Sequence, residues 1–322
     1  MYITETAQKI IVEGMKKSRY VKPGDFLLSN SMSFGRPYIL KIDGCIHDGW
    51  LVLRDENALF DKRFLYYYLS SKTTYKKLKS MAVGGVVNNL NSEMVRNVIV
   101  PVPDKEEQSE IADLFDKIKK ILDDRKQELE QLDTLVKSRF VEMFGDIITG
   151  KYNYKIRKLG DVAFIGSSHR VFTTEFVESG IPFYRGTEIG ELANGIEPSE
   201  PYYISEEHYN KLTKDNTKPR IGDLLMPSIC NKGQIWMVDT DRPFYYKDGR
   251  VLCISPNRDI FNSKYLEYFM RIKTLVEYPK LGSGSTFAEF KIFLLKDMDV
   301  LVPPRNVQNQ FADFVASVDK SK

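Results

Sequence analysis

Three short polar stretches carry the side chains that could do chemistry in this sequence. They are Ser167-Ser168-His169-Arg170, Tyr184-Arg185-Gly186-Thr187 and Asn231-Lys232-Gly233-Gln234. In the major groove of DNA, arginine reads guanine, and asparagine or glutamine reads adenine. A glycine next to an arginine also lets the backbone approach a phosphate closely. These residue types predict contacts to a nucleic acid, and the alternative that each stretch is an ordinary polar turn stays open.

Two glycine-containing loops add further candidates. Gly282 to Thr286 (GSGST) and Gly84 to Asn89 (GGVVNN) both have flexible, uncharged tips, which favours contact loops over simple connectors. The complete set of DNA-contact candidates is Ser168, His169, Arg170, Tyr184, Arg185, Thr187, Asn231, Lys232, Gln234, Ser283, Ser285, Thr286, Asn88, Asn89 and Arg36.

Catalytic equipment is missing from the sequence. It has no GxxxxGK[ST] phosphate loop, no NPPY-like adenine-methylation tetrapeptide and no glycine-rich methyl-donor loop. Glu289-Phe290-Lys291 fits the ExK fragment of metal-dependent nucleases, but matches this short arise often by chance. His47, His169 and His208 have no partners at metal-ligand spacing. We therefore expect no catalytic residue, no metal and no cofactor.

A single long helix is predicted from Asp104 to Asp146. The stretch lacks proline and reaches its first glycine at Gly145, a helix stop. Apolar residues recur at heptad spacing, which predicts one half of a coiled coil about 60 Å long. The residues expected to face a partner helix are Phe115, Leu122, Leu129, Leu132, Val136 and Met143. Aspartate at Leu129 or Val136 is expected to break this spacer without harming the globule that follows.

The chain repeats itself with an offset of 200 residues. VIVPVPDKEEQSEIADLFD, starting at Val98, matches MDVLVPPRNVQNQFADFVASVD, starting at Met298, with Gln108 opposite Gln308. Earlier pairs include Tyr2-Ile3-Thr4-Glu5 with Tyr203-Ile204-Ser205-Glu206, and KPGDFLL with RIGDLL. This pattern predicts one structural unit used twice.

Two parts of the repeat lack counterparts. The segment from Tyr152 to Tyr202 has no matching segment before Tyr2. At the other end, Lys322 matches Leu122, which lies in the middle of the predicted long helix, the first rod of the repeat. We therefore expect a truncated or rearranged arrangement, in which part of the apolar seam from Leu129 to Met143 lacks its partner. The chain would then self-associate or recruit a second chain.

Charge and composition narrow the class of protein. Of the 47 basic and 44 acidic residues, 8 and 13 lie in the predicted rod, so 39 and 31 remain in the globular parts. An acidic rod between basic globules favours a nucleic-acid partner for the globules. Three distant cysteines, no membrane-spanning run and no signal peptide indicate a protein of the reducing cytoplasm without membrane association.

Short strand signals and helices alternate in the globular parts. Between Tyr152 and Pro303, IRKLGDVAFIG reads as an entry helix turn followed by a first strand, and IPFYRGTEI reads as an extended run with a glycine break. RIGDLLMPSI, GQIWMVD and VLCISP read as short strands, and Ser263 to Thr274 reads as a helix. The strands come in groups, which favours a mixed α/β (α+β) class. The expected parts are a first globule at 1–102 lacking its opening third, a helix region at 103–150, a complete globule at 151–302 and the start of a second rod at 303–322.

The order and spacing of these motifs resemble the specificity subunit of type I restriction-modification enzymes. The motifs are GD before an aliphatic pair, the FLYYYL helix, a glycine loop, the VPxP exit and a long helix beginning with glutamate and glutamine. The resemblance covers essentially the whole chain. It implies two target recognition domains that read a bipartite double-stranded DNA site and two antiparallel rods that serve as spacer. It also implies two docked modification subunits that methylate adenine, with restriction subunits joining through the complex.

Two other classes stay open at this stage. One is a nuclease or methyltransferase fused to recognition domains, which binding of a methyl donor by the isolated chain would support. The other is a coiled-coil scaffold that binds only protein, which a salt-dependent DNA shift by the isolated chain would exclude.

Overall fold

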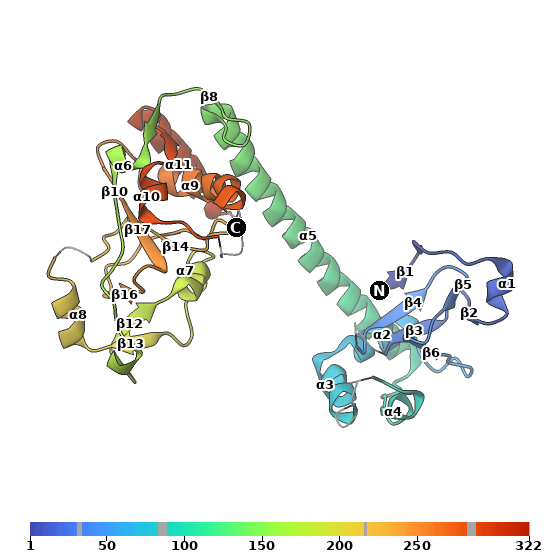
Figure 1. Cartoon of the computed structure of the whole chain (residues 1–322). Coiled ribbons are helices and arrows are strands. Elements are labelled where there is room, and N and C mark those ends of the chain that lie inside the picture. Colours follow the sequence, from blue (N-terminus) through green and yellow to red (C-terminus); the bar gives the residue numbers. More distant parts are fainter. Residues whose placement is uncertain (31–33, 83–88, 216–217, 282–287, 322) are drawn as a thin grey trace. The chain divides into compact units, whose positions relative to one another are not determined.

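The structure is a computed structural model and describes residues 1–30, 34–82, 89–215, 218–281 and 288–321 (Figure 1). The chain divides into two compact units, Met1–Gln127 and Glu128–Lys322, which we call the first and second units. Helix α5 (Lys105–Phe144) runs through the boundary, so each unit contains part of it. Both units combine short strands with helices, which confirms the expected mixed α/β class.

The first unit is built on a four-stranded sheet with the order β1-β4-β3-β6. β1 is parallel to β4, and the other neighbours are antiparallel. Strand β3 is buried along its whole length. The elements in chain order are β1 (Tyr2–Ile3), α1 (Val12–Met15), β2 (Arg19–Val21), β3 (Phe26–Ser29), β4 (Pro37–Leu40), β5 (Gly44–Ile46), β6 (Trp50–Leu53), α2 (Lys62–Ser70), α3 (Lys72–Met81), α4 (Ser92–Arg96) and the first part of α5.

The second unit contains two four-stranded sheets, with the orders β10-β17-β14-β15 and β11-β13-β12-β16. Its elements after α5 are β7 (Gly145–Asp146), β8 (Lys151–Tyr152), β9 (Ile156–Lys158), α6 (Leu159–Val162), β10 (Ala163–Gly166), η1 (Thr173–Glu175), β11 (Phe176–Val177), β12 (Ile181–Tyr184), α7 (Gly186–Leu192), β13 (Tyr202–Ile204), α8 (Glu206–Leu212), β14 (Leu224–Pro227), β15 (Trp236–Met237), β16 (Tyr245–Tyr246), β17 (Val251–Pro256), α9 (Ser263–Glu277), η2 (Tyr278–Leu281), α10 (Ile292–Lys296), β18 (Asp299–Leu301) and α11 (Arg305–Asp319). The run IPFYRGTEI, expected to be extended, is strand only as far as Tyr184, because Gly186 begins α7.

A glycine–aspartate turn starts the central strand of each unit. Gly24 and Gly222 have φ angles of +91° and +84°, a conformation that glycine adopts without strain. The buried carboxylate of Asp25 accepts hydrogen bonds from the Lys22 backbone N–H and from the Arg54 guanidinium. Asp223 likewise accepts from the Arg220 N–H and from Arg258. The GD motif is therefore a charged turn that fixes where β3 and β14 begin.

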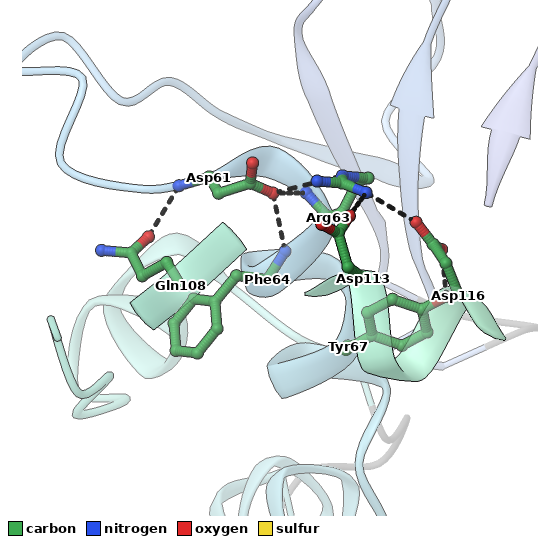
Figure 2. A network of polar contacts seen from close by, with 7 residues as sticks. All are labelled: Asp61, Arg63, Phe64, Tyr67, Gln108, Asp113 and Asp116. Atoms are coloured by element: carbon green, nitrogen blue, oxygen red, sulfur yellow. Dashed lines mark hydrogen bonds and ion pairs between the residues drawn. The ribbon is translucent and has the colours of Figure 1, made fainter. Parts of the chain in front are cut away.

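A buried glutamine ties α5 to the globule of the first unit. The Oε1 atom of Gln108 accepts the Asp61 backbone N–H at 2.7 Å, and its Nε2 donates to the carbonyls of Leu59 and Pro103. Asp61 in turn caps α2, because its carboxylate accepts the N–H groups of Arg63 and Phe64. Figure 2 shows this cap lying against α5.

An ionic network holds α2 against α5 beside that glutamine (Figure 2). Nη1 of Arg63 donates to Asp113 at 2.6 Å and to Asp116 at 2.8 Å. The Tyr67 hydroxyl also donates to Asp116, at 2.5 Å. Burial raises the pKa of Asp116, but the hydrogen bonds from Tyr67 and Arg63 outweigh it, so the pKa lies below its usual value. Asp116 therefore stays ionised and keeps the helices paired.

The last part of α5 is embedded in the core of the second unit. Phe140 and Phe144 are fully buried and pack against Tyr265 of α9 and Phe311 of α11. One continuous apolar cluster joins them to α6, β10, β17 and β18. The second unit thus has one large apolar cluster and two smaller ones, whereas the buried residues of the first unit fall into small clusters only.

The exposed part of the α5 seam is not the part expected from the sequence. Val136 is 4% exposed, and Leu132 and Met143 pack against the core of the second unit. In contrast, Phe115, Leu122 and Leu129 are 44%, 65% and 36% exposed. The expectation that the Leu129–Met143 segment lacks a partner was wrong for Leu132, Val136 and Met143, because α11 begins beside the end of α5 and covers it.

Candidate nucleic-acid interface

Backbone hydrogen bonds gather several loops of the second unit at one edge of its main sheet. The Ser228 N–H donates to the Arg250 carbonyl at 2.8 Å, and the Phe290 N–H donates to the Ser228 carbonyl at 2.7 Å. The Lys247 N–H donates to the Tyr184 carbonyl at 2.9 Å. We call the residues brought together in this way the loop face: 166–170, 184–187, 227–234, 246–251 and 288–291. Segments from across the second unit thus converge on one surface.

The serine–histidine stretch is fastened into this face. Ser167 Oγ accepts the Gly249 N–H at 2.8 Å, and Ser168 Oγ donates to the Tyr246 carbonyl at 2.5 Å. The next two side chains point to acidic partners: His169 Nε2 lies 2.6 Å from Asp215, and Arg170 Nε donates to Asp248 at 3.3 Å. His169 and Arg170 are exposed, whereas the hydroxyl of Ser168 is used to hold the loop.

Arg185 has a structural role that the sequence did not indicate. Its guanidinium pairs with the carboxylate of Glu188, whose side chain is 5% exposed, and lies 4.6 Å from the ring centre of Tyr202. Burial raises the pKa of Glu188, but the hydrogen bonds from Arg185 outweigh it and bring the pKa below its usual value. Arg185 therefore compensates a buried charge at the start of α7 as well as reaching the surface.

The neighbours of Arg185 differ in accessibility. Tyr184 is 8% exposed, and its ring stacks on Phe244 with centres 5.3 Å apart, so this side chain belongs to the core. Burial raises the pKa of the Tyr184 hydroxyl. Thr187, on the first turn of α7, is exposed. Of these two candidates, Thr187 is the one that a ligand can reach.

The Asn231–Gln234 turn joins β14 to β15, as expected. Asn231 and Lys232 are exposed, and Gln234 is partly buried with its Oε1 accepting the Lys232 N–H at 3.1 Å. Gly233 has a φ of +66° and lies against the Arg271 carbonyl of α9. The turn is thereby held to the body of the unit while Lys232 projects from it.

Three basic side chains of the loop face are absent from the DNA-contact candidates predicted from the sequence. Lys247, Arg250 and Lys291 are exposed, and the last two share the carboxylate of Glu289. Arg250 Nη1 lies 3.0 Å from one oxygen of Glu289, and Lys291 Nζ contacts the other. The hydrogen bond from Lys291, together with the charge of Arg250, lowers the pKa of Glu289. The residues of the ExK match therefore form part of a basic cluster, in which each carboxylate oxygen of Glu289 is paired with a basic side chain.

The first unit has an equivalent but less basic edge. The Asn30 N–H donates to the Gly49 carbonyl, and the Leu90 N–H donates to the Asn30 carbonyl, each at 3.0 Å. The candidates Asn89 and Arg36 are exposed there, the latter just before β4. Four further candidates, Asn88, Ser283, Ser285 and Thr286, lie outside the described residues.

Other chemistry finds no support among the described residues. In the ranges given above, no group of three or more His, Cys, Asp or Glu side chains could hold a metal ion. The cysteines Cys45, Cys230 and Cys253 are free, and burial raises the pKa of Cys230 to about 11 and that of Cys253 to about 12. No helix in the described part of the chain is both long and apolar enough to cross a membrane.

Comparison with known proteins shows which family the chain resembles. Residues 2–132 match the family model described as the type I restriction modification DNA specificity domain. The MjaVIII specificity subunit of Methanocaldococcus jannaschii is 23% identical over 340 aligned residues, covering 99% of this chain and 77% of that protein. The MjaIX specificity subunit of the same organism is 22% identical, covering 98% and 76%.

The chain is similar to type I restriction specificity subunits along nearly its whole length. Its fold agrees with solved structures of such systems. One from a study of type I R-M complex assembly superposes with a TM-score of 0.58 at 18% identity, covering 94% of this chain and 76% of that one. The type I restriction-modification S subunit from M. genitalium gives 0.56 at 14% identity, covering 95% and 78%. The domain match over residues 2–132 and the likeness to specificity subunits support a DNA sequence recognition role.

Proposed function

We propose that this specificity subunit reads a bipartite double-stranded DNA site for a type I restriction-modification enzyme, whose other subunits methylate adenine and cut the DNA. The observation that carries the proposal is the loop face of the second unit. It places Arg170, Lys232, Lys247, Arg250 and Lys291 around hydrogen-bonding loops on one rigid edge. Cations on such a surface bind phosphates, and neighbouring polar side chains read base edges.

The first unit is proposed to read the other half of the site. Its edge carries Asn89 and Arg36 in the positions that Glu289 and Gln234 occupy in the second unit. The proposal of two equivalent readers is supported by the shared glycine–aspartate turn. Gln308 also repeats the contacts of Gln108: its Oε1 accepts a backbone N–H at the cap of α9, and its Nε2 donates to two carbonyls. We assign the parts as before: recognition domains at 1–102 and 151–302, the central helix at 103–150 and the start of a second helix at 303–322.

The middle of α5 is proposed to bind protein. Residues 119–130 are exposed and mostly charged, with four basic and four acidic side chains. The whole helix region 104–146 has 13 acidic and 8 basic residues, and this excess of negative charge disfavours DNA. This surface suits the modification subunits, two per specificity subunit, with restriction subunits joining through them. The apolar Phe115, Leu122 and Leu129 beside it suit an antiparallel partner helix, supplied by self-association or by another chain.

A methylome experiment tests the function. The chain would be co-expressed with the modification subunit encoded beside it in a host lacking other adenine methylation, and methylated adenines mapped across the genome. We expect one bipartite motif, and partial loss of methylation across all sites when Lys232 and Lys247 are both replaced by alanine. A methylation pattern that does not depend on this chain would contradict the proposal.

A protein-only scaffold is the second candidate, favoured by the exposed and charged middle of α5, residues 119–130. The isolated chain separates the two candidates in a DNA mobility shift repeated at several salt concentrations. Salt-dependent binding supports DNA recognition, and the absence of any shift at low salt supports the scaffold.

A further inference from the structure

A groove of about 800 Å³ opens in the first unit beside β6. Its apolar wall comes from β6, α2, α4 and the segment after α4, and consists of Leu53, Leu65, Leu69, Val95, Val98 and Val100. β6 is the last strand of its sheet in the described part of the chain, so its outer edge has backbone groups without a strand partner. An apolar groove along an open strand edge is a site where an added strand can pair.

The corresponding groove in the second unit is filled by residues of the same unit. The counterparts of the six groove residues, 200 or 201 positions later, are Ile254, Leu266, Met270, Leu295, Met298 and Val300. All of them share one core cluster with Leu159, Val162 and Ile165 of α6 and β10. These three side chains belong to Ile156–Gly166, a strand, a single helical turn and a second strand.

Backbone pairing holds that filling segment on both sides. Strand β10 pairs antiparallel with β17, the counterpart of β6, and β9 pairs antiparallel with β18. Between them, the Leu159 N–H donates to the Met298 carbonyl at 2.8 Å. In the first unit, the counterpart of β18 is the segment 98–101, which has no strand partner in the described structure.

We propose that the groove of the first unit is a docking site for a strand–turn–strand peptide segment with the chemistry of Ile156–Gly166. The segment Ile156–Gly166 has apolar side chains at its fourth, seventh and tenth positions. Each of its two strands, like β9 and β10, can pair with one neighbouring strand of the groove. The groove has room for it, because Leu69, Val95 and Val98 are no larger than their counterparts Met270, Leu295 and Met298. An identical copy of the chain is a poorer donor, since its own segment is already seated in its second unit.

Side-chain alternation after α4 gives the proposal a matched pair of variants. Val98 and Val100 line the groove, whereas Ile99 between them is 76% exposed. The counterpart of Ile99 is Asp299, which pairs with Lys158 of the filling segment at 2.9 Å. Val100→Asp therefore places a charged side chain inside the groove. Ile99→Asp instead places a carboxylate outside the groove, where it can pair with the lysine of the docked segment that corresponds to Lys158.

The test uses the full chain and a labelled synthetic peptide covering residues 154–167, followed by fluorescence anisotropy. We expect saturable binding, lost with Val100→Asp and kept or tightened by about two- to fivefold with Ile99→Asp, as for an exposed ion pair. A peptide carrying Leu159→Asp and Val162→Asp should not bind the unaltered chain, which keeps the test valid if a protein variant misfolds. Hydrogen exchange should show new protection at residues 50–60 and 98–101.

Three outcomes would overturn the proposal. They are the absence of saturable binding, equal binding of the doubly substituted peptide, and protection confined to residues 251–261 and 298–301 of the second unit. The DNA-binding proposal is measured separately by the salt-dependent shift, so either idea can fail without the other.

Discussion

Gln108 and Gln308 are both fully buried and make the same three hydrogen bonds, although 200 residues separate them in the chain. Gln308 Oε1 accepts the Asn262 N–H at 2.8 Å, and its Nε2 donates to the carbonyls of Ile260 and Pro303. In each unit the glutamine joins the start of a long helix to the cap of the helix that packs on it.

Gln308→Ala should destabilise the second unit by about 2–4 kcal/mol, because one N–H and two carbonyls lose their partners in a buried place. The chain has two tryptophans, Trp50 and Trp236, one in each unit. In a Trp50→Phe background, fluorescence during urea unfolding therefore reports the second unit. Gln310→Ala, at an exposed position of α11, is the control. Equal stability of the two variants would contradict a structural role for this glutamine.

Lowering the pH should reduce the free energy of unfolding of the first unit, because Asp25 becomes protonated. The hydrogen bond from Arg54 holds the pKa of this buried carboxyl below its usual value. A lowered pKa in the folded state means that the stabilisation is complete above the unfolded pKa of about 3.9 and is lost as pH falls through the folded value. In a Trp236→Phe background, urea unfolding should show a steep loss of stability below about pH 4. Asp25→Asn should lower stability at pH 7 and flatten that dependence.

Lys232→Ala and Lys247→Ala should each weaken DNA binding at low salt and reduce the salt slope by about one unit. Both side chains project from the loop face. Arg305→Ala is the matched control, because Arg305 is an exposed cation at the start of α11, beyond the far end of β17. If the control weakens binding as much as the lysine variants, the interface has been placed on the wrong surface.

Arg185→Ala should destabilise the second unit by about 1–3 kcal/mol, since Glu188 would stay buried without its cation. Glu188→Gln in the same chain should recover much of this loss. A double-mutant cycle by urea unfolding measures the coupling. Additive effects would show that the pair is not coupled, and DNA binding by the double variant would then report any direct contact of Arg185.

Val136→Asp should unfold the second unit, because this side chain is 4% exposed in its core. The earlier expectation that it would break only the spacer does not hold for this position. Leu122→Asp, at a residue 65% exposed, should leave both units folded. Light scattering should then show that Leu122→Asp lowers any self-association of the chain. Unchanged association would place the contact elsewhere than the exposed seam.

Periodic and local features could be predicted from the sequence alone. The heptad pattern and the absence of glycine predicted α5 to within two residues at each end, because a long amphipathic helix is set by local spacing. The run RIGDLLMPSI was predicted to form a strand, and the structure adds that its Gly-Asp pair is the turn before β14, where the positive φ needs glycine. The family resemblance followed from the order of these local motifs.

The tertiary structure decided which polar residues are accessible. Tyr184 and Arg185 are neighbours of suitable chemistry, yet one is buried in the core and the other compensates Glu188, a contact between α7 and its own cap. Lys247, Arg250 and Lys291 reach the same edge only because β16, β17 and α10 meet there. Which half of the α5 seam is covered depended in the same way on α11 packing back against it. Burial is set by contacts between segments far apart in the chain, and local spacing carries no information about those contacts.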